Sequence, residues 1–247
     1  KKVFERHSGE IAALVMEPLM QGAAGMIDQP EGYISGVKKL TRQYNILLIF
    51  DEVATGFGRT GQMFASDHEK VTPDLLTLAK GLTGGYLPLA VTLATEEIYK
   101  GFLGSYSELK TFFHGHTYTA NPLACRAAAA SLELFDKKKV LEKLGQKIDF
   151  LRERLKAFWN LQHVGDIRQV GFMAGIELVE ERTSRKPYPL KEKIGIRVVR
   201  EARKRGAILR PLGNVIVLMP PLAMTRRELG KLINMTYDSI REATEVS

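Results

Sequence analysis

An apolar run, Asn45–Phe50 (NILLIF), constrains the fold of this chain more than any other feature. Unbroken runs of this kind are typical of a strand whose two faces are both covered, as in a parallel sheet flanked by helices. Helical periodicity predicts a helix just before it, at Tyr33–Gln43. Further strands are expected at Ala12–Glu17, Leu75–Ala79 and Leu89–Ala94. This alternation predicts an α/β domain with a mainly parallel sheet.

The chain changes character from about residue 137. A helix is expected at Leu123–Phe135, because Asn121 is a good N-cap and Pro122 suits the first helical position. An amphipathic helix should follow, since Leu141, Leu144, Ile148, Leu151, Leu155 and Phe158 recur at helical spacing. The later strands are expected at Asp166–Val170, Phe172–Leu178, Ala207–Leu209 and Val215–Met219, and the later helices at Lys191–Arg205 and Arg226–Ala243. We predict two domains, 1–136 and a smaller α/β domain at 137–247.

The composition is that of an ordinary globular protein, with 45% hydrophobic and 26% charged residues. No stretch approaches the roughly 20 apolar residues of a membrane span, so no membrane contact is expected. The single cysteine, Cys125, cannot form an internal disulfide, which favours a reducing cytoplasm. Its place on an alanine-rich helix predicts a small buried residue.

The net charge of +8 is concentrated in one stretch. Its basic residues are Arg182, Arg185, Lys186, Lys191, Lys193, Arg197, Arg200, Arg203, Lys204, Arg205 and Arg210. One interpretation is a patch for nucleic acid or an anionic ligand. The other is a solvated helix face, which we favour because the chain carries no recognised nucleic-acid motif.

Two residues near predicted strand ends could carry chemistry. Asp51 directly follows the NILLIF run, and ligands of open α/β sheets bind outside the carboxyl ends of strands. It could hold a cationic ring nitrogen or a metal, although a single Asp in this place is weak evidence. Its neighbour Glu52 should point the opposite way along an extended chain. Lys80 follows the Leu75–Ala79 strand and precedes a glycine-rich turn, so its amine could form a Schiff base or could be an ordinary surface lysine.

Other polar positions leave more than one interpretation open. Gly115-His116-Thr117 offers backbone N–H groups and a hydroxyl, a possible phosphate cradle. His114 and His116 could suggest a metal, but further ligands at a usual spacing are missing, and no metal site is expected. Arg210 is expected at the end of the Ala207–Leu209 strand, where it could grip a carboxylate or be one member of the basic run.

These pieces together resemble one family. The segments IFDEVATGFGRTG (Ile49–Gly61) and PDLLTLAKGLTGG (Pro73–Gly85), with their spacing, resemble the signature of class III, fold-type I, pyridoxal-phosphate-dependent aminotransferases. HGHTYTANPLAC (His114–Cys125) agrees with it in order. Within the family, Met16–Met26, Gly61–His68 and Ile208–Pro221 are most similar to enzymes of biotin synthesis that aminate 8-amino-7-oxononanoate, giving 7,8-diaminononanoate.

The resemblance implies a role for each candidate. Lys80 would hold pyridoxal 5′-phosphate (PLP) through its amine and act as the catalytic base, and Asp51 would pair with the ring nitrogen. Thr117, with His116, would bind the phosphate of the neighbouring subunit's cofactor, so a homodimer with shared sites is implied. Gly115 and Arg210 would contact the substrate, and Arg210 would bind the substrate's carboxylate. Two further residues, Glu17 and Arg59, would support the site.

The resemblance has departures. Family members are considerably longer, and their phosphate-binding glycine–serine loop and ring-stacking aromatic residue would precede Lys1. Residues 1–136 would then be the C-terminal part of the large cofactor-binding domain. Val217 stands where a better-known form of the biotin enzyme has tyrosine, which leaves the donor open between S-adenosylmethionine and lysine. His116 replaces a proline.

Two alternatives remain. One is another class III aminotransferase, of the ω-amino acid or acetylornithine type, which a substrate panel would separate. The other is a non-catalytic binding module on the same fold, for which the basic run is the only support.

Overall fold

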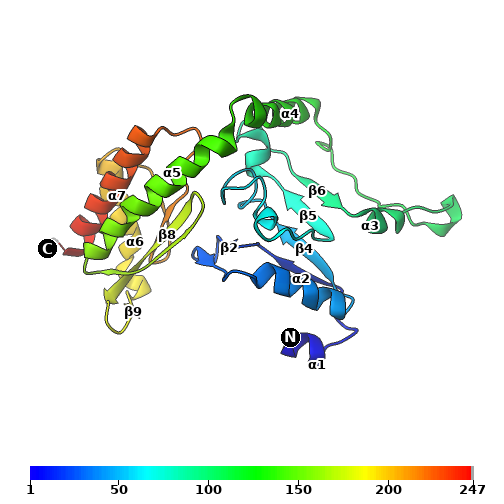
Figure 1. Ribbon diagram of the computed structural model, residues 1–247, viewed down its shortest axis with the longest axis horizontal. Coiled ribbons are helices and arrows are strands. Elements are labelled where there is room, and N and C mark those ends of the chain that lie inside the picture. Colours follow the sequence, from blue (N-terminus) through cyan, green and yellow to red (C-terminus); the bar gives the residue numbers. More distant parts are fainter. Residues whose placement is uncertain (246–247) are drawn as a thin grey trace. The chain divides into compact units, whose positions relative to one another are not determined.

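The computed structural model describes residues 1–245 and divides into two compact units (Figure 1). Unit 1 contains Lys1–Leu19, Pro30–Phe57 and Phe64–Lys139. Unit 2 contains Met20–Gln29, Gly58–Met63 and Val140 onward. Two short segments from the first half of the chain thus belong to unit 2, and the predicted domain boundary at residue 136 stays a prediction.

Unit 1 is built on a four-stranded sheet in the order β1-β4-β5-β6 (Figure 1). These strands are β1 (Ala13–Met16), β4 (Leu47–Asp51), β5 (Leu75–Leu78) and β6 (Val91–Ala94). The first three are mutually parallel, and β6 runs antiparallel to β5. The helices of the unit are α1 (Lys2–Arg6), α2 (Tyr33–Gln43), α3 (Glu96–Lys100) and α4 (Pro122–Lys137). The predicted sheet, mainly parallel, is therefore present.

Local sequence decides how α2 ends and β4 begins. Helix α2 has the bounds that its periodicity predicts, and its buried Ile34 packs with Leu48 and Phe50 of β4. The strand starts at Leu47 rather than at Asn45, because the two residues before it complete the helix end. Asn45 has a left-handed φ of 53°, and the N–H of Ile46 donates to the carbonyl of Thr41 over 2.9 Å.

Helix α4 starts as the sequence predicts but exposes its cysteine. The side chain of Asn121 accepts hydrogen bonds from the N–H groups of Leu123 and Ala124, and Pro122 occupies the first turn. The expectation that Cys125 is buried is wrong, since its side chain is exposed. The buried face of the helix passes through Ala124 and Ala128, four residues apart, and successive residues of an α-helix point in different directions. Cys125 therefore lies off that face.

Unit 2 is built on an antiparallel sheet in the order β10-β11-β8-β7, with β9 paired to β8 (Figure 1). These strands are β7 (Val164–Val170), β8 (Met173–Glu181), β9 (Lys186–Pro187), β10 (Arg210–Leu212) and β11 (Val215–Leu218). A two-stranded hairpin of β2 (Met20–Gln21) and β3 (Ile27–Asp28) belongs to the same unit. Its long helices are α5 (Val140–Leu155), α6 (Ile194–Lys204) and α7 (Arg226–Glu245).

The hydrophobic core of unit 2 follows the predicted stripe of α5. Leu144, Ile148, Leu151 and Leu155 are buried, as is Phe158 in the turn that follows the helix. Helix α7 begins with the predicted capping box. The N–H of Thr225 donates to Glu228 over 2.8 Å, and the N–H of Glu228 donates to the Thr225 hydroxyl over 3.3 Å.

One predicted strand lies further along the chain than expected. The prediction placed it at Ala207–Leu209, with Arg210 at its end, whereas β10 begins at Arg210. Residues after α6 first close the helix: Gly206 has a φ of 90°, and the N–H of Ala207 donates to the carbonyl of Ala202 over 2.9 Å. The chain can therefore pair with β11 only from Arg210 onward.

Acidic or carbonyl partners accompany several cations of the basic run. Lys186 lies 2.7 Å from Glu180, and Lys204 lies 2.6 Å from Glu201. Arg197 donates to the carbonyl of Ala243 over 2.6 Å. This pairing is typical of a solvated surface, part of it on helix α6 and part on strands β8 and β9. Within residues 1–245, no helix is long and apolar enough to cross a membrane.

Candidate active site

Three predicted residues follow or end parallel strands of unit 1. Asp51 is the last residue of β4 and pairs in register with Thr77 of β5. Glu17 comes directly after β1, and Lys80 comes two residues after β5 ends. Because the three strands are parallel, their carboxyl ends lie at one edge of the sheet, where open α/β sheets bind ligands. The structure thus brings the predicted acid and the predicted lysine to the same edge.

The two side chains differ in their surroundings. Asp51 is half-buried, and its Oδ1 accepts a hydrogen bond from the N–H of Val53 over 3.0 Å. Lys80 is exposed and begins a short 3-10 helix, η2 (Lys80–Thr83), with a left-handed φ of 44°. A non-glycine residue in that region is uncommon and is held there by its surroundings. The edge therefore offers a fixed carboxylate and a lysine that a ligand can reach.

Glu52 is turned into the protein, in keeping with the expectation that it points away from Asp51. It is fully buried and accepts hydrogen bonds from the N–H groups of Ala65 and Ser66, over 2.6 Å and 2.9 Å. Burial raises the pKa of Glu52, and these hydrogen bonds oppose the rise. The sequence gives Glu52 no function, because the contact with residues 65 and 66 depends on how the chain turns.

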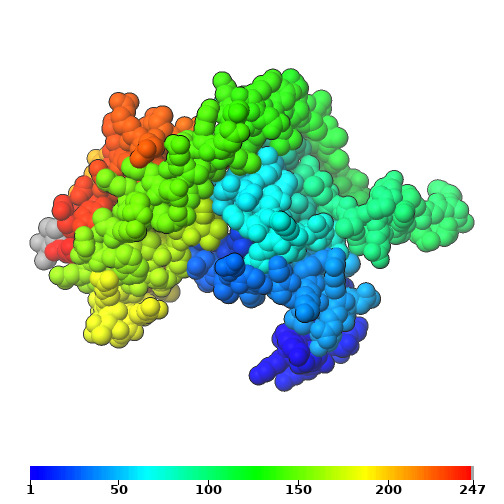
Figure 2. Space-filling model, in the orientation of Figure 1, coloured from blue at the N-terminus to red at the C-terminus, as the bar shows by residue number. Residues whose placement is uncertain are grey.

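The segment with the predicted phosphate cradle is exposed along its whole length. Residues 101–120 are all exposed, and this segment projects from the rest of unit 1 (Figure 2). His116 stabilises the turn locally, since its Nδ1 accepts the N–H of Tyr118 over 3.2 Å and its carbonyl accepts the N–H of Thr119 over 2.9 Å. Thr117 lies within this turn, and Gly115 directly precedes it. The large exposed apolar side chains of this region are Tyr99, Phe102, Leu103, Tyr106, Leu109, Phe112, Phe113 and Tyr118.

Arg210 belongs to unit 2, whereas the other predicted catalytic and cofactor-binding residues belong to unit 1. Its side chain is exposed, and it pairs with Val217 across β10 and β11. Val217 is half-buried and packs against a small cluster formed by Met20, Met26, Met173 and Val215. The guanidinium thus lies outside the hydrophobic core, next to the half-buried Val217.

Arg59 holds two loops of unit 2 together. Its guanidinium donates to the carbonyl of Pro220, and its own carbonyl accepts the N–H of Phe172 over 2.8 Å. Burial lowers the pKa of Arg59. The contact is close enough to require Gly171, where an added Cβ would lie 2.2 Å from the backbone of Thr60. Arg59 therefore stabilises the loop, and the support of the catalytic site expected from it stays a prediction.

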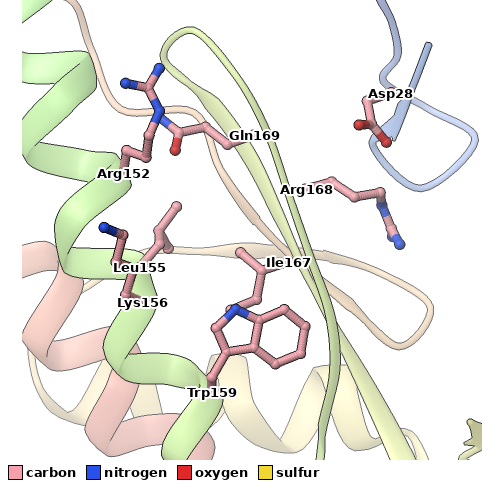
Figure 3. A pocket seen from close by; sticks show the side chains of 8 residues that line it. All are labelled: Asp28, Arg152, Leu155, Lys156, Trp159, Ile167, Arg168 and Gln169. Carbon is pink, nitrogen blue, oxygen red and sulfur yellow. The ribbon is translucent and has the colours of Figure 1, made fainter. Parts of the chain in front are cut away.

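A shallow pocket of unit 2 involves none of the predicted residues (Figure 3). Its volume is about 350 Å³, and its lining residues are Asp28, Arg152, Leu155, Lys156, Trp159, Ile167, Arg168 and Gln169. Arg168 is already engaged, because it donates to the carbonyls of Gly25 and Met26 and to two carboxylates, Asp166 and Glu177. Arg152 and Lys156 have acidic neighbours on α5. Within residues 1–245, no group of three or more His, Cys, Asp or Glu residues could hold a metal ion.

The sequence profile of the family described as "Aminotransferase class-III" matches residues 1–240. The chain belongs to the class III aminotransferases. A relative from Geobacter sulfurreducens, named adenosylmethionine-8-amino-7-oxononanoate aminotransferase, is 54% identical over 99% of this chain and 54% of its own length. A relative of the same name from Anoxybacillus flavithermus is also 54% identical, over 98% of this chain and 54% of its own length. This chain thus spans about half the length of these class III relatives.

Solved structures of class III aminotransferases have the same fold. The adenosylmethionine-8-amino-7-oxononanoate aminotransferase of Methanocaldococcus jannaschii superposes with a TM-score of 0.95 at 48% identity, covering 98% of this chain and 56% of that one. An (S)-enantioselective ω-transaminase from Thermomicrobium roseum superposes with a TM-score of 0.93 at 35% identity, covering 99% of this chain and 54% of that one. The predicted α/β fold and family are confirmed. Class III aminotransferases use PLP.

Proposed function

We propose that the protein with this chain transfers an amino group, through PLP, to 8-amino-7-oxononanoate in biotin synthesis, with S-adenosylmethionine as donor. One observation carries the catalytic part: Asp51 ends one parallel strand and Lys80 follows its neighbour at the same sheet edge. The relatives named for this reaction support the substrate, at 54% identity along nearly the whole chain. In this proposal, residues 1–136 belong to the large cofactor-binding domain, and 137–247 form a small domain.

The residues at the sheet edge fit the requirements of PLP. A lysine that holds this cofactor must be reachable, and Lys80 is exposed. A partner for the ring nitrogen must stay ionised and oriented, and the hydrogen bond from Val53 orients Asp51. We propose that Lys80 and Asp51 hold the cofactor here, with His116 and Thr117 on the phosphate. When bound, PLP supplies an electron sink that makes a proton on the adjacent substrate carbon removable.

Each residue of the chain then has a defined task. With the cofactor bound, Asp51 would accept a hydrogen bond from the ring nitrogen and stabilise its positive charge. Lys80 would take a proton at Nζ and return it, as a general base and acid. The backbone of Lys80 is held in the left-handed region, which fixes the position from which its side chain extends.

The exposed segment supports a homodimer with shared sites. Thr117 belongs to a segment whose large apolar side chains, at residues 99–118, are exposed, and exposed apolar surface can mark an interaction site. In a dimer, the Thr117 hydroxyl and the His116 turn would bind the phosphate of the partner's cofactor, and Gly115 would contact the substrate. The exposure of Gly115 to Thr117 makes them available for these contacts.

Arg210 would set the substrate's orientation. An exposed guanidinium beside the half-buried Val217 suits a ligand that ends in a carboxylate and has an apolar chain, as 8-amino-7-oxononanoate does. Two parallel hydrogen bonds would hold the far end of the substrate, which places the reacting end.

The proposal is tested on the purified protein that contains this chain. We expect visible absorbance from a PLP–lysine linkage, its loss after borohydride, and the label on Lys80 in peptide mapping. A substrate panel then compares 8-amino-7-oxononanoate with ω-amino acid and acetylornithine-type substrates. Turnover of only the ω-amino acid or acetylornithine-type substrates would reject 8-amino-7-oxononanoate as the substrate but would keep the proposal of an aminotransferase. DNA binding that depends on salt, without cofactor absorbance, would favour a binding module.

A further inference from the structure

The side chain of Glu52, directly after strand β4, is bound by several hydrogen bonds. The fully buried carboxylate accepts the N–H groups of Ala65 and Ser66, as well as the Thr55 hydroxyl over 3.3 Å. The residues at 65 and 66 begin a 3-10 helix, η1 (Ala65–Glu69). A buried carboxylate is costly unless its lone pairs are satisfied, and these hydrogen bonds satisfy those of Glu52.

The backbone of Glu52 fixes the same region. Its N–H donates to the carbonyl of Thr77 on β5 over 3.0 Å, which extends the strand pairing beyond Asp51. Its carbonyl accepts the N–H of Gly56 over 3.0 Å, and an added Cβ at Gly56 would lie 2.8 Å from that carbonyl oxygen. Glu52 therefore ties the start of the loop after β4 to the sheet and ties the end of that loop to η1.

The loop after β4 places Phe57 against Gly81, the residue that follows Lys80. Phe57 is buried with a left-handed φ of 55°, and its ring packs edge-on against Phe64, with centroids 5.8 Å apart. At Gly81, an added Cβ would lie 2.8 Å from the Cβ of Phe57. Phe57 therefore packs directly on the backbone that follows Lys80, whose own φ is also left-handed. Phe57 and Phe64 are the positions where the chain leaves and re-enters unit 1.

We infer that Glu52 is a positioning residue: its carboxylate holds the ends of this loop so that Phe57 packs on Gly81 and fixes the direction of Lys80. The inference rests on the proposed function of Lys80. The carboxylate of Glu52 acts on that lysine through Phe57 and Gly81, and it lies too deep to touch a ligand itself.

The test substitutes Glu52→Gln in the purified protein after removal of the cofactor. The glutamine side chain keeps the shape of glutamate, but its NH₂ group cannot accept the backbone N–H that a carboxylate oxygen accepts in the unaltered protein. Two quantities are measured: hydrogen exchange at the amides of Ala65 and Ser66, and the rate at which added PLP is fixed on Lys80 by borohydride. We expect both amides to lose protection, and labelling of Lys80 to slow by about tenfold, since small misplacements of a reacting group are costly.

Glu69→Gln is the matched control. Glu69 lies on the same short helix, and its carboxylate also accepts two backbone N–H groups, those of Gly32 and Ser35 at the start of α2. That variant should lose protection at Gly32 and Ser35 and label Lys80 at the original rate. If Glu52→Gln does not fold, Thr55→Val removes one of the hydrogen bonds to Glu52, and a slowing of about two- to threefold is expected, in line with one weak hydrogen bond.

The outcomes separate this inference from the proposed function. Unaltered protein without a label on Lys80 overturns both. Labelled unaltered protein, with Glu52→Gln losing amide protection but labelling at the original rate, overturns the inference alone and makes Glu52 a structural residue. Equal slowing in Glu69→Gln also overturns it, because the effect would then come from general loosening of η1.

Discussion

Arg210 and Val217 lie directly opposite each other in the antiparallel pair β10–β11. Opposite residues of such a pair carry their side chains on the same face of the sheet. The exposed guanidinium and the half-buried Val217 are therefore neighbours on one surface, although the chain turns between them. One surface can thus contact both a carboxylate and the apolar chain beside it.

Arg210→Ala should weaken binding of the keto-acid substrate. The side chain is exposed in the free chain; if the bound substrate buries the pair, loss of the carboxylate's partner costs on the order of 2–5 kcal/mol. The KM for the keto acid should therefore rise much more than the KM for the amino donor, and Arg210→Lys should restore only part of the loss. Steady-state kinetics with each substrate varied in turn measures this. Equal effects on both substrates, or none, would assign Arg210 to the solvated basic surface.

Val217→Tyr should change donor preference. The larger side chain would cover more of the surface beside Arg210 and bring a hydroxyl to it. We expect the ratio of kcat/KM for S-adenosylmethionine to that for lysine to change by about tenfold, the effect of one or two hydrogen bonds. The measurement uses both donors with the same acceptor, and Val217→Ile serves as the apolar control. An unchanged ratio in Val217→Tyr would remove this position from donor selection.

Asp51→Asn should leave the fold intact and reduce turnover strongly. The amide accepts the N–H of Val53 as the carboxylate does, but it cannot stabilise a positive ring nitrogen. We expect kcat to fall on the order of a hundredfold, as when a fixed electrostatic contact is removed. Kinetics together with the unfolding midpoint separates chemistry from stability. Near-normal turnover would exclude the proposed function of Asp51.

A mixture of two inactive variants should recover activity if sites are shared between subunits. Lys80→Ala removes the cofactor lysine, and Thr117→Ala removes the hydroxyl proposed to serve the partner. In a mixed dimer, one of the two sites has both groups intact, so activity up to about a quarter of the original is expected when subunits exchange freely. The measurement is activity after co-refolding, with each variant alone as control. A fully active monomer would contradict the shared site.

Arg168→Met should destabilise unit 2. The side chain is mostly buried and holds the carbonyls of Gly25 and Met26, which would be left without these donors. We expect a loss of about 1–3 kcal/mol in the free energy of unfolding. Urea unfolding measures it, and Arg152→Met is the matched control, because its pair with Asp149 is exposed and worth little. Similar losses in both variants would mean that the contacts of Arg168 are not the cause.

Local patterns are enough to predict many elements and the family. The period of apolar residues sets helix α2 and the buried stripe of α5, and Asn121 and Thr225 mark helix starts through contacts with residues two or three positions away. These interactions are short-range, so the order of residues determines them. The motifs around Asp51 and Lys80 identify the class III family because they, too, depend only on the order of residues.

Tertiary structure decided what depends on distant residues. The packing of Phe57 on Gly81 and the burial of Glu52 under residues 65 and 66 exist only because the loop folds back. The exposure of Cys125 and the late start of β10 at Arg210 have the same origin: which face of a helix is covered, and where a strand finds its partner, are settled by other segments. Sequence determined the local elements because their hydrogen bonds close nearby, whereas the site's supports needed contacts that only the folded chain makes.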